Sequence, residues 1–210
     1  MGDLKAPSLS KREGEEGLIA TYKLRNLGTD IHNDPDVQVR IYSDLVALSR
    51  ALKIGGRLVL DFLGVQLISP VLLTGVFSQM ERAATEHGRG FFRGRFLIAK
   101  DINPDIRETI LSLLKQQQAS LLVLYEAEGG TTTTEILNLP PFLSETLKLV
   151  QEDGPLTSSQ LAELLGKDKG SSARERLRQL YRKGLVTRTA HGTLEGARYF
   201  EYEAFSVKRA

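Results

Sequence analysis

The stretch that decides the fold of the C-terminal part is Gly170–Leu185, GSSARERLRQLYRKGL. Its apolar residues recur at helical spacing, because Ala173, Leu177 and Leu180 stand at positions i, i+4 and i+7. A serine at position 171 or 172 can cap the first turn, and Gly184 stands where a helix ends in a left-handed conformation. The stretch therefore predicts a helix over 171–183 with one narrow apolar face and arginines on the rest of its surface.

The residues on both sides of this helix predict a small domain over 139–210. Two prolines open a helix at 139–150, a short extended piece follows at Leu156-Thr157, and Ser158 is expected to cap a second helix. Residues 185–190 and 197–205 predict a β-hairpin whose turn is His191-Gly192. The predicted order is therefore helix, short strand, helix, turn, helix, hairpin.

This order, together with the KGLV segment that ends the third helix, resembles a winged helix-turn-helix domain. The resemblance implies an α+β fold in which the helix over 171–183 enters the major groove of duplex DNA. The residues expected to contact DNA are Lys167, Lys169, Ser171, Ser172, Arg174, Arg178, Lys183, Arg188 and His191. Arg174 and Arg178 are expected at guanines, the lysines and Arg188 at phosphates, and His191 in a neighbouring groove. One such domain makes few contacts, so a homodimer that binds two half-sites is expected.

Positive charge is concentrated in this region, although the net charge of the chain is only +2. Eight basic residues lie within the 22 residues from 167 to 188, opposed only by Asp168 and Glu175. A run of charge is often just a solvated helix face, but its coincidence with the helix over 171–183 favours an anionic partner.

Strand and helix patterns alternate over residues 18–138, whereas residues 1–17 are polar and are expected to form a disordered tail. Strands are predicted at 18–27, 58–60, 95–99, 121–125 and 131–137, with a turn-rich loop at 28–36. Helices are predicted after Asp36, Ser69 and Asn103 as capping residues. Such alternation predicts an α/β domain with a mostly parallel sheet covered by helices.

The segment LVLDFLGVQLISPVLL, residues 58–73, resembles STAS and STAS-like domains. In these a strand ends in Asp, a hydrophobic–Gly–Val loop follows, and a helix begins at a small polar residue. The resemblance implies a module for protein interaction or dimerisation, with Asp61 and Ser69 at the contact and an ATPase of the histidine-kinase type as the kind of partner. In the STAS antagonists of anti-sigma factors the helix opens with Asp-Ser, and that serine is phosphorylated. Here Ser69-Pro70 stand at those positions, so the switch does not transfer, and helix capping accounts for Ser69.

The remaining residues argue against catalysis. The three histidines, His32, His87 and His191, lack metal-binding spacing, no glycine-rich nucleotide fingerprint occurs, and the chain has no cysteine. A small hydrolase that uses Asp61 is the weakest alternative, because no partner group stands beside Asp61 in the sequence. Arginines and glycines at 88–95 suggest an exposed turn. Without an apolar run of about 20 residues or a signal peptide, we expect no membrane partner and a cytoplasmic location.

These features together predict a DNA-binding transcriptional regulator without cofactor, metal or enzymatic activity. A second interpretation is a protein-interaction adaptor in which the winged helix docks a partner and DNA is not bound. It is favoured by Glu175 inside the supposed DNA-facing surface and by the hairpin glutamates Glu195, Glu201 and Glu203. A continuous positive surface over 171–182 would favour DNA, and a mixed or apolar one the adaptor.

Overall fold

A computed structural model of the 210-residue chain describes residues 19–85, 95–126, 132–166, 170–192 and 198–204. Within these ranges the side chains of 78–85, 126, 132, 170 and 198 are not described. The expected tail at 1–17, His87, most of the turn at 88–95, Lys167 and Lys169 therefore lie outside the described residues. The chain divides into two compact units, residues 1–138 and 139–210, and each is described here by itself.

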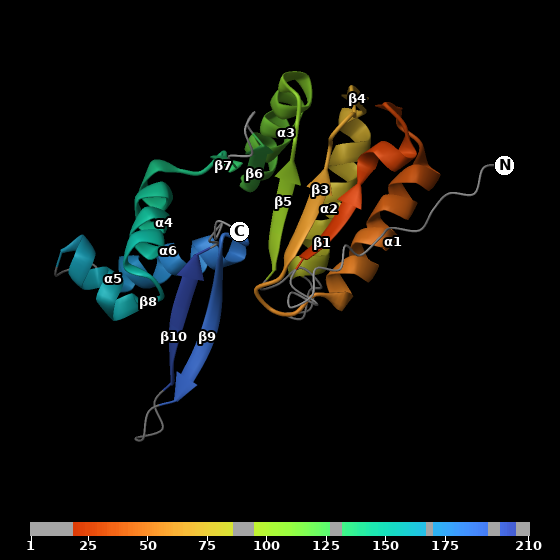
Figure 1. Ribbon diagram of the computed structural model, residues 1–210. Coiled ribbons are helices and arrows are strands. Elements are labelled where there is room, and N and C mark those ends of the chain that lie inside the picture. Colours follow the sequence, from red (N-terminus) through yellow and green to blue (C-terminus); the bar gives the residue numbers. More distant parts are fainter. Residues whose placement is uncertain (1–18, 86–94, 127–131, 167–169, 193–197, 205–210) are drawn as a thin grey trace. The chain divides into compact units, whose positions relative to one another are not determined.

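The first unit is built on a mostly parallel five-stranded sheet (Figure 1). Its strands are β1 (Ile19–Lys23), β3 (Arg57–Asp61), β5 (Phe96–Lys100), β6 (Leu121–Glu126) and β7 (Thr132–Leu137), in that order across the sheet. Neighbouring strands from β1 to β6 are parallel, and β7 pairs antiparallel with β6. This is an α/β arrangement, and the chain contains six α-helices within the part that the structure describes.

Three helices connect the parallel strands of this unit: α1 (Pro35–Ala51), α2 (Pro70–Thr85) and α3 (Pro104–Gln117). Each begins with a proline. Proline lacks a backbone N–H, and this is tolerated at the first helical position because an N–H there has no acceptor within the helix. Asp34, rather than the expected Asp36, caps α1, because its Oδ1 accepts from the Asp36 amide at 2.8 Å and Pro35 fixes the first helical position. Asn103 caps α3 as expected, through the Ile106 amide at 2.9 Å.

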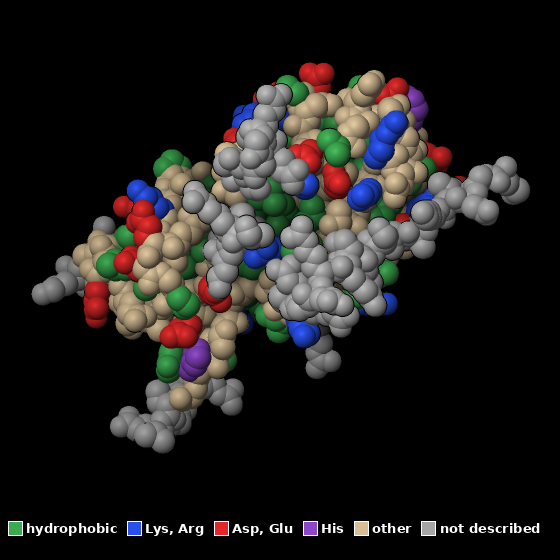
Figure 2. All heavy atoms as spheres, viewed as in Figure 1, with side chains coloured by type: hydrophobic (Ala, Val, Ile, Leu, Met, Phe, Trp, Pro, Cys, Tyr) green, Lys and Arg blue, Asp and Glu red, His purple; other side chains and the backbone are tan. Residues whose placement is uncertain are grey.

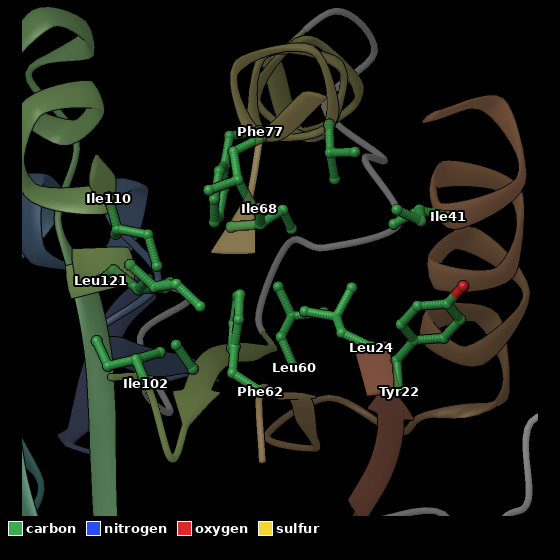
Figure 3. Close-up of a cluster of buried hydrophobic side chains, with 14 of the residues drawn as sticks. Tyr22, Leu24, Ile41, Leu60, Phe62, Ile68, Phe77, Ile102, Ile110 and Leu121 are labelled. Atoms are coloured by element: carbon green, nitrogen blue, oxygen red, sulfur yellow. The ribbon is translucent and has the colours of Figure 1, made fainter. Parts of the chain in front are cut away.

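The core of the first unit lies between these helices and one face of the sheet (Figure 3). Tyr22 and Leu60 come from adjacent strands, Ile41 from α1, Phe77 from α2 and Ile110 from α3, and all are buried. Helical spacing in the sequence predicts an inward face of four residues, and all of them are buried: Ile41, Leu45 and Leu48 on α1, and Leu52 directly after it. Helix α2 packs against both α1 and α3, so the helices form a continuous layer.

Two short elements at the start of this unit differ from the sequence prediction. The strand expected over 18–27 ends at Lys23, and Leu24–Leu27 forms a 3₁₀ turn, η1, with Leu24 buried in the core. The expected loop at 28–36 contains a two-residue strand, β2 (Asp30–Ile31), which pairs with β4 (Leu67–Ile68) ahead of α2. Strands of two residues carry too little alternation to be recognised in a sequence.

The second unit contains three helices and a small antiparallel sheet. Its elements are α4 (Pro141–Asp153), β8 (Leu156–Thr157), α5 (Ser158–Leu165), α6 (Gly170–Arg182), β9 (Val186–Gly192) and β10 (Arg198–Ala204). Strand β10 lies between β8 and β9 and pairs antiparallel with both. The core combines side chains from all three helices and the sheet, among them Leu143, Leu161, Leu177 and Tyr202.

Three local predictions for this unit are wrong. Thr157, not Ser158, caps α5, because Thr157 forms a reciprocal capping box with Gln160. The sequence pattern predicts that Leu161, Leu164 and Leu165 face inward, but Leu164 is 48% exposed on a helix of only eight residues. His191 and Gly192 are not the hairpin turn, because β9 continues through both of them and His191 pairs with Tyr199 across the ladder.

No described helix is both long enough and apolar enough to cross a membrane.

Candidate nucleic-acid interface

Helix α6 is held in the second unit by its inner face and by its C-terminal end. Ala173, Leu177 and Leu180 are completely buried, as the helical spacing predicts. Gly184 has a φ of 67°, and its amide donates to the Tyr181 carbonyl at 3.1 Å, while the Leu185 amide donates to the Leu180 carbonyl at 3.0 Å. This bond pair is a Schellman motif, which requires a left-handed residue and therefore favours glycine.

The outward side of α6 carries a stripe of polar and charged side chains, which we call the α6 stripe: Ser171, Arg174, Glu175, Arg178 and Arg182. The arginines at 174, 178 and 182 are exposed. Glu175 lies among them, 3.8 Å from Arg178 and 3.7 Å from Arg182, measured from guanidinium nitrogen to carboxylate oxygen. The stripe is therefore mixed in sign, with an excess of positive charge.

Exposed ion pairs of this kind contribute about 0–1 kcal/mol each, because water and salt screen both charges. Arg178 and Arg182 are 53% and 61% exposed in their side chains, so Glu175 leaves most of each guanidinium in contact with solvent. One carboxylate therefore weakens the positive potential of the stripe without cancelling it.

Arg176 is different from the other arginines of α6, because its side chain is only 17% exposed. Its Nη1 atom lies 3.2 Å from Glu145 Oε2 and donates to the Phe142 carbonyl at 3.3 Å. The guanidinium also lies over the Phe142 ring, 5.6 Å from its centroid. Arg176 therefore ties α6 to α4, and it is unsuited to contact a ligand on the outer side.

Arg188 on β9 contacts two aromatic rings. Its guanidinium carbon lies 4.5 Å from the ring centroid of Tyr181 on α6 and 4.5 Å from that of Phe200 on β10. Both distances fall within the usual range of about 6 Å for a cation–π contact. The sequence predicts a basic residue here but gives no sign of the stack, whose members are 19 residues apart in the chain from Tyr181 to Phe200.

His191 lies on the other face of the hairpin, within the strand. Its Nε2 atom is 2.8 Å from Glu201 Oε2, and its ring stacks on Tyr199 with centroids 5.2 Å apart. Alternation along the strands places Glu203 on this same face. The face that carries His191 therefore also carries two carboxylates, which is unfavourable for an approaching phosphate.

The structure brings some of the predicted residues together and separates others. Ser171, Arg174 and Arg178 lie on the outward stripe, whereas Ser172 and Lys183 are half-buried at its margin. Arg182, which the prediction left out, belongs to the stripe, and its spacing of four from Arg178 could have identified it. Figure 2 shows acidic side chains on the displayed face of the second unit, over α4 and α5.

The residues singled out in the first unit lie near the carboxyl ends of its strands. Asp61 ends β3, and its Oδ1 accepts from the Leu63 amide at 2.9 Å. Its register partners are Lys23 on β1 and Lys100 on β5, groups that the sequence around Asp61 does not reveal. Ser69 precedes α2, and its carbonyl accepts from the Leu73 amide at 3.1 Å.

Among the described residues no group of three or more His, Asp or Glu side chains could hold a metal ion. Comparison with known proteins found no matching family model, no matching curated protein and no matching solved structure.

Proposed function

We propose that residues 139–210 are a winged helix-turn-helix domain that binds duplex DNA, with α6 in the major groove. The order of elements from α4 to β10 and the buried apolar face of α6 support the winged-helix interpretation. The observation that carries the DNA proposal is the outward α6 stripe, where Arg174, Arg178 and Arg182 are exposed on the side opposite the buried residues. A helix of this size fits the major groove, and arginine matches the acceptors on a guanine edge.

In this proposal the first unit is a STAS-like module that mediates protein interaction or dimerisation and makes the whole protein a transcriptional regulator. The strand that ends in Asp61, the turn after it and the helix that starts after Ser69 support this part. A dimer would present two α6 helices to two half-sites about 34 Å apart.

The test is a fluorescence-anisotropy titration of the full-length protein with a random-sequence duplex at several salt concentrations. We expect salt-dependent binding, and Arg174→Gln and Arg178→Gln should each weaken it. On a random-sequence duplex these arginines face phosphates rather than one particular guanine, so each loss should also reduce the slope of log affinity against log salt by about 0.9. Lys148→Gln is the matched control, because Lys148 is an exposed cation on α4, away from the stripe, that pairs with Glu152. Binding without any salt dependence, or equal losses for all three variants, would count against the proposal.

A protein-interaction adaptor is the second candidate, and the mixed sign of the α6 stripe favours it. Glu175→Gln separates the two functions, because it removes the carboxylate beside Arg178 and Arg182. If α6 contacts DNA, this variant should bind a duplex more tightly than the wild type. If the stripe docks a protein, neither the wild type nor this variant should bind DNA more tightly than an unrelated protein measured under the same conditions.

A further inference from the structure

We propose that Arg188 is a positioning residue, whose guanidinium, in contact with the rings of Tyr181 and Phe200, fixes the orientation of the β9–β10 hairpin on α6. The inference rests on the proposed function only for the expected effect on DNA binding, which requires that the helix and the hairpin contact the same duplex. It replaces the expectation that Arg188 serves mainly as a phosphate contact.

The stack joins the three elements that would form the DNA-facing surface. Tyr181 lies in the last turn of α6, Arg188 in β9 and Phe200 in β10. The guanidinium carbon is equally distant, 4.5 Å, from both ring centroids, so one cation contacts the rings of two different elements. A planar guanidinium is suited to this arrangement, whereas the ammonium of lysine is a compact point charge without faces to stack.

The Phe200 side of the stack lies beyond the part of the hairpin that the core holds, because Tyr202, which pairs with Arg188, is the last buried residue on this face. At the base, Val186 and Ala204 are paired and buried, and the chain enters β9 directly from the Schellman motif at Gly184. Arg188 lies two pairs further along, where it pairs with the buried Tyr202, and Phe200 lies two pairs further again on the same face. The stack thus gives the hairpin a second attachment to α6. Two attachments fix the orientation of the hairpin relative to α6, whereas one attachment at the base does not.

Arg188→Lys distinguishes this role from a phosphate contact. Lysine keeps the positive charge, so a residue that only holds a phosphate should tolerate it. Lysine does not restore the stack, so a positioning residue should not. Tyr181→Leu and Phe200→Leu remove a ring without changing any charge, and Phe200 is partly exposed, so its variant is expected to fold.

The experiment is the salt-dependent anisotropy titration with a random-sequence duplex, using these three variants and Arg40→Lys. Arg40 is the matched control, since it is a partly exposed arginine of α1 in the first unit, outside the proposed interface, and pairs with Asp44. We expect the three stack variants to bind about three- to tenfold more weakly with an unchanged salt slope. The double variant Arg188→Lys/Phe200→Leu should bind DNA no more weakly than the single variants, because each single substitution already disrupts the same stack. Arg40→Lys should bind as the wild type does, because Arg40 takes no part in the proposed interface.

The proposal is overturned if Arg188→Lys binds as the wild type and Arg188→Met lowers the salt slope by about 0.9, which is the behaviour of a phosphate contact. It is also overturned if Phe200→Leu has no effect. Residual dipolar couplings of backbone amides in β9, β10 and α6 provide a measurement without DNA. The wild-type couplings should fit one common orientation, and those of Arg188→Lys should not. Absence of wild-type DNA binding would therefore reject the proposed function, while the couplings would still decide the role of Arg188.

Discussion

Asn103 shows how one side chain can serve two segments at once. Its Oδ1 accepts from the Ile106 amide and caps α3, while its Nδ2 donates to the carbonyls of Val65 at 3.1 Å and Gln66 at 3.0 Å. The loop that follows β3 is thereby fastened to the start of α3. Only an amide combines the acceptor and the two donors that these positions need.

Asn103→Ala should therefore lower the free energy of unfolding by about 2 kcal/mol, from a lost cap and lost loop hydrogen bonds. Asn103→Ser is the matched control, because it keeps a capping oxygen and loses the two amide donors. Its loss should be about half as large. Urea unfolding followed by circular dichroism measures both values, and equal stability of the alanine variant and the wild type would contradict the assignment.

At the scale of elements, the edge strand β7 is tied to α3 by charge. Arg107 on α3 forms an ion pair with Glu135 on β7, and the Tyr125 hydroxyl donates to the same carboxylate at 3.1 Å. The hydrogen bond from Arg107 holds the pKa of Glu135 below its usual range. The same contact raises the pKa of Arg107.

A carboxylate whose pKa is lower in the folded state stabilises the fold above its unfolded pKa, and this contribution disappears as pH falls through the folded pKa. Glu135→Gln should therefore lower the unfolding temperature at pH 7, and the difference should narrow below about pH 4. Glu108→Gln is the control, since Glu108 also contacts Arg107 but is its sequence neighbour and is highly exposed. Thermal unfolding by circular dichroism across this pH range is the measurement; a constant difference would be inconsistent with the assignment.

Periodicity predicted these elements well, because burial of one helix face or one strand face leaves a regular trace in the sequence. The inward positions Ile41, Leu45, Leu177 and Leu180 are examples. Helix starts were less certain because capping residues occur in clusters. Where Asp, Pro and Asp follow one another at 34–36, the proline decides which aspartate caps.

The candidate site was predictable only in part, for a related reason. The α6 stripe follows from spacing within one helix, which the sequence contains. The stack around Arg188 and the anchoring of Arg176 on Glu145 depend on pairs far apart in the chain. Their geometry is set by packing between elements, and local sequence patterns do not predict such contacts.

At the scale of the whole molecule, each of the two units has its own buried core. Leu45 is completely buried in the first and Leu177 in the second. Leu45→Ala and Leu177→Ala should each destabilise the unit that contains the substitution by about 2–5 kcal/mol. Hydrogen exchange measured by mass spectrometry in increasing urea should show faster exchange confined to that unit, each variant serving as the other's control. Uniformly faster exchange through the whole chain would mean that the protein unfolds as one cooperative unit.

Strand β7 ends the five-stranded sheet, and β6 is its only partner among the described strands. The backbone amides and carbonyls on its outer side form a sheet edge. An extended segment of another molecule can pair with such an edge through backbone hydrogen bonds, without matching side chains. Threonines at 133 and 134 and the carboxylate of Glu135 make that edge polar. Polar side chains along an edge strand disfavour the pairing of one sheet with another, so the composition of β7 opposes such association without any part in the proposed recognition.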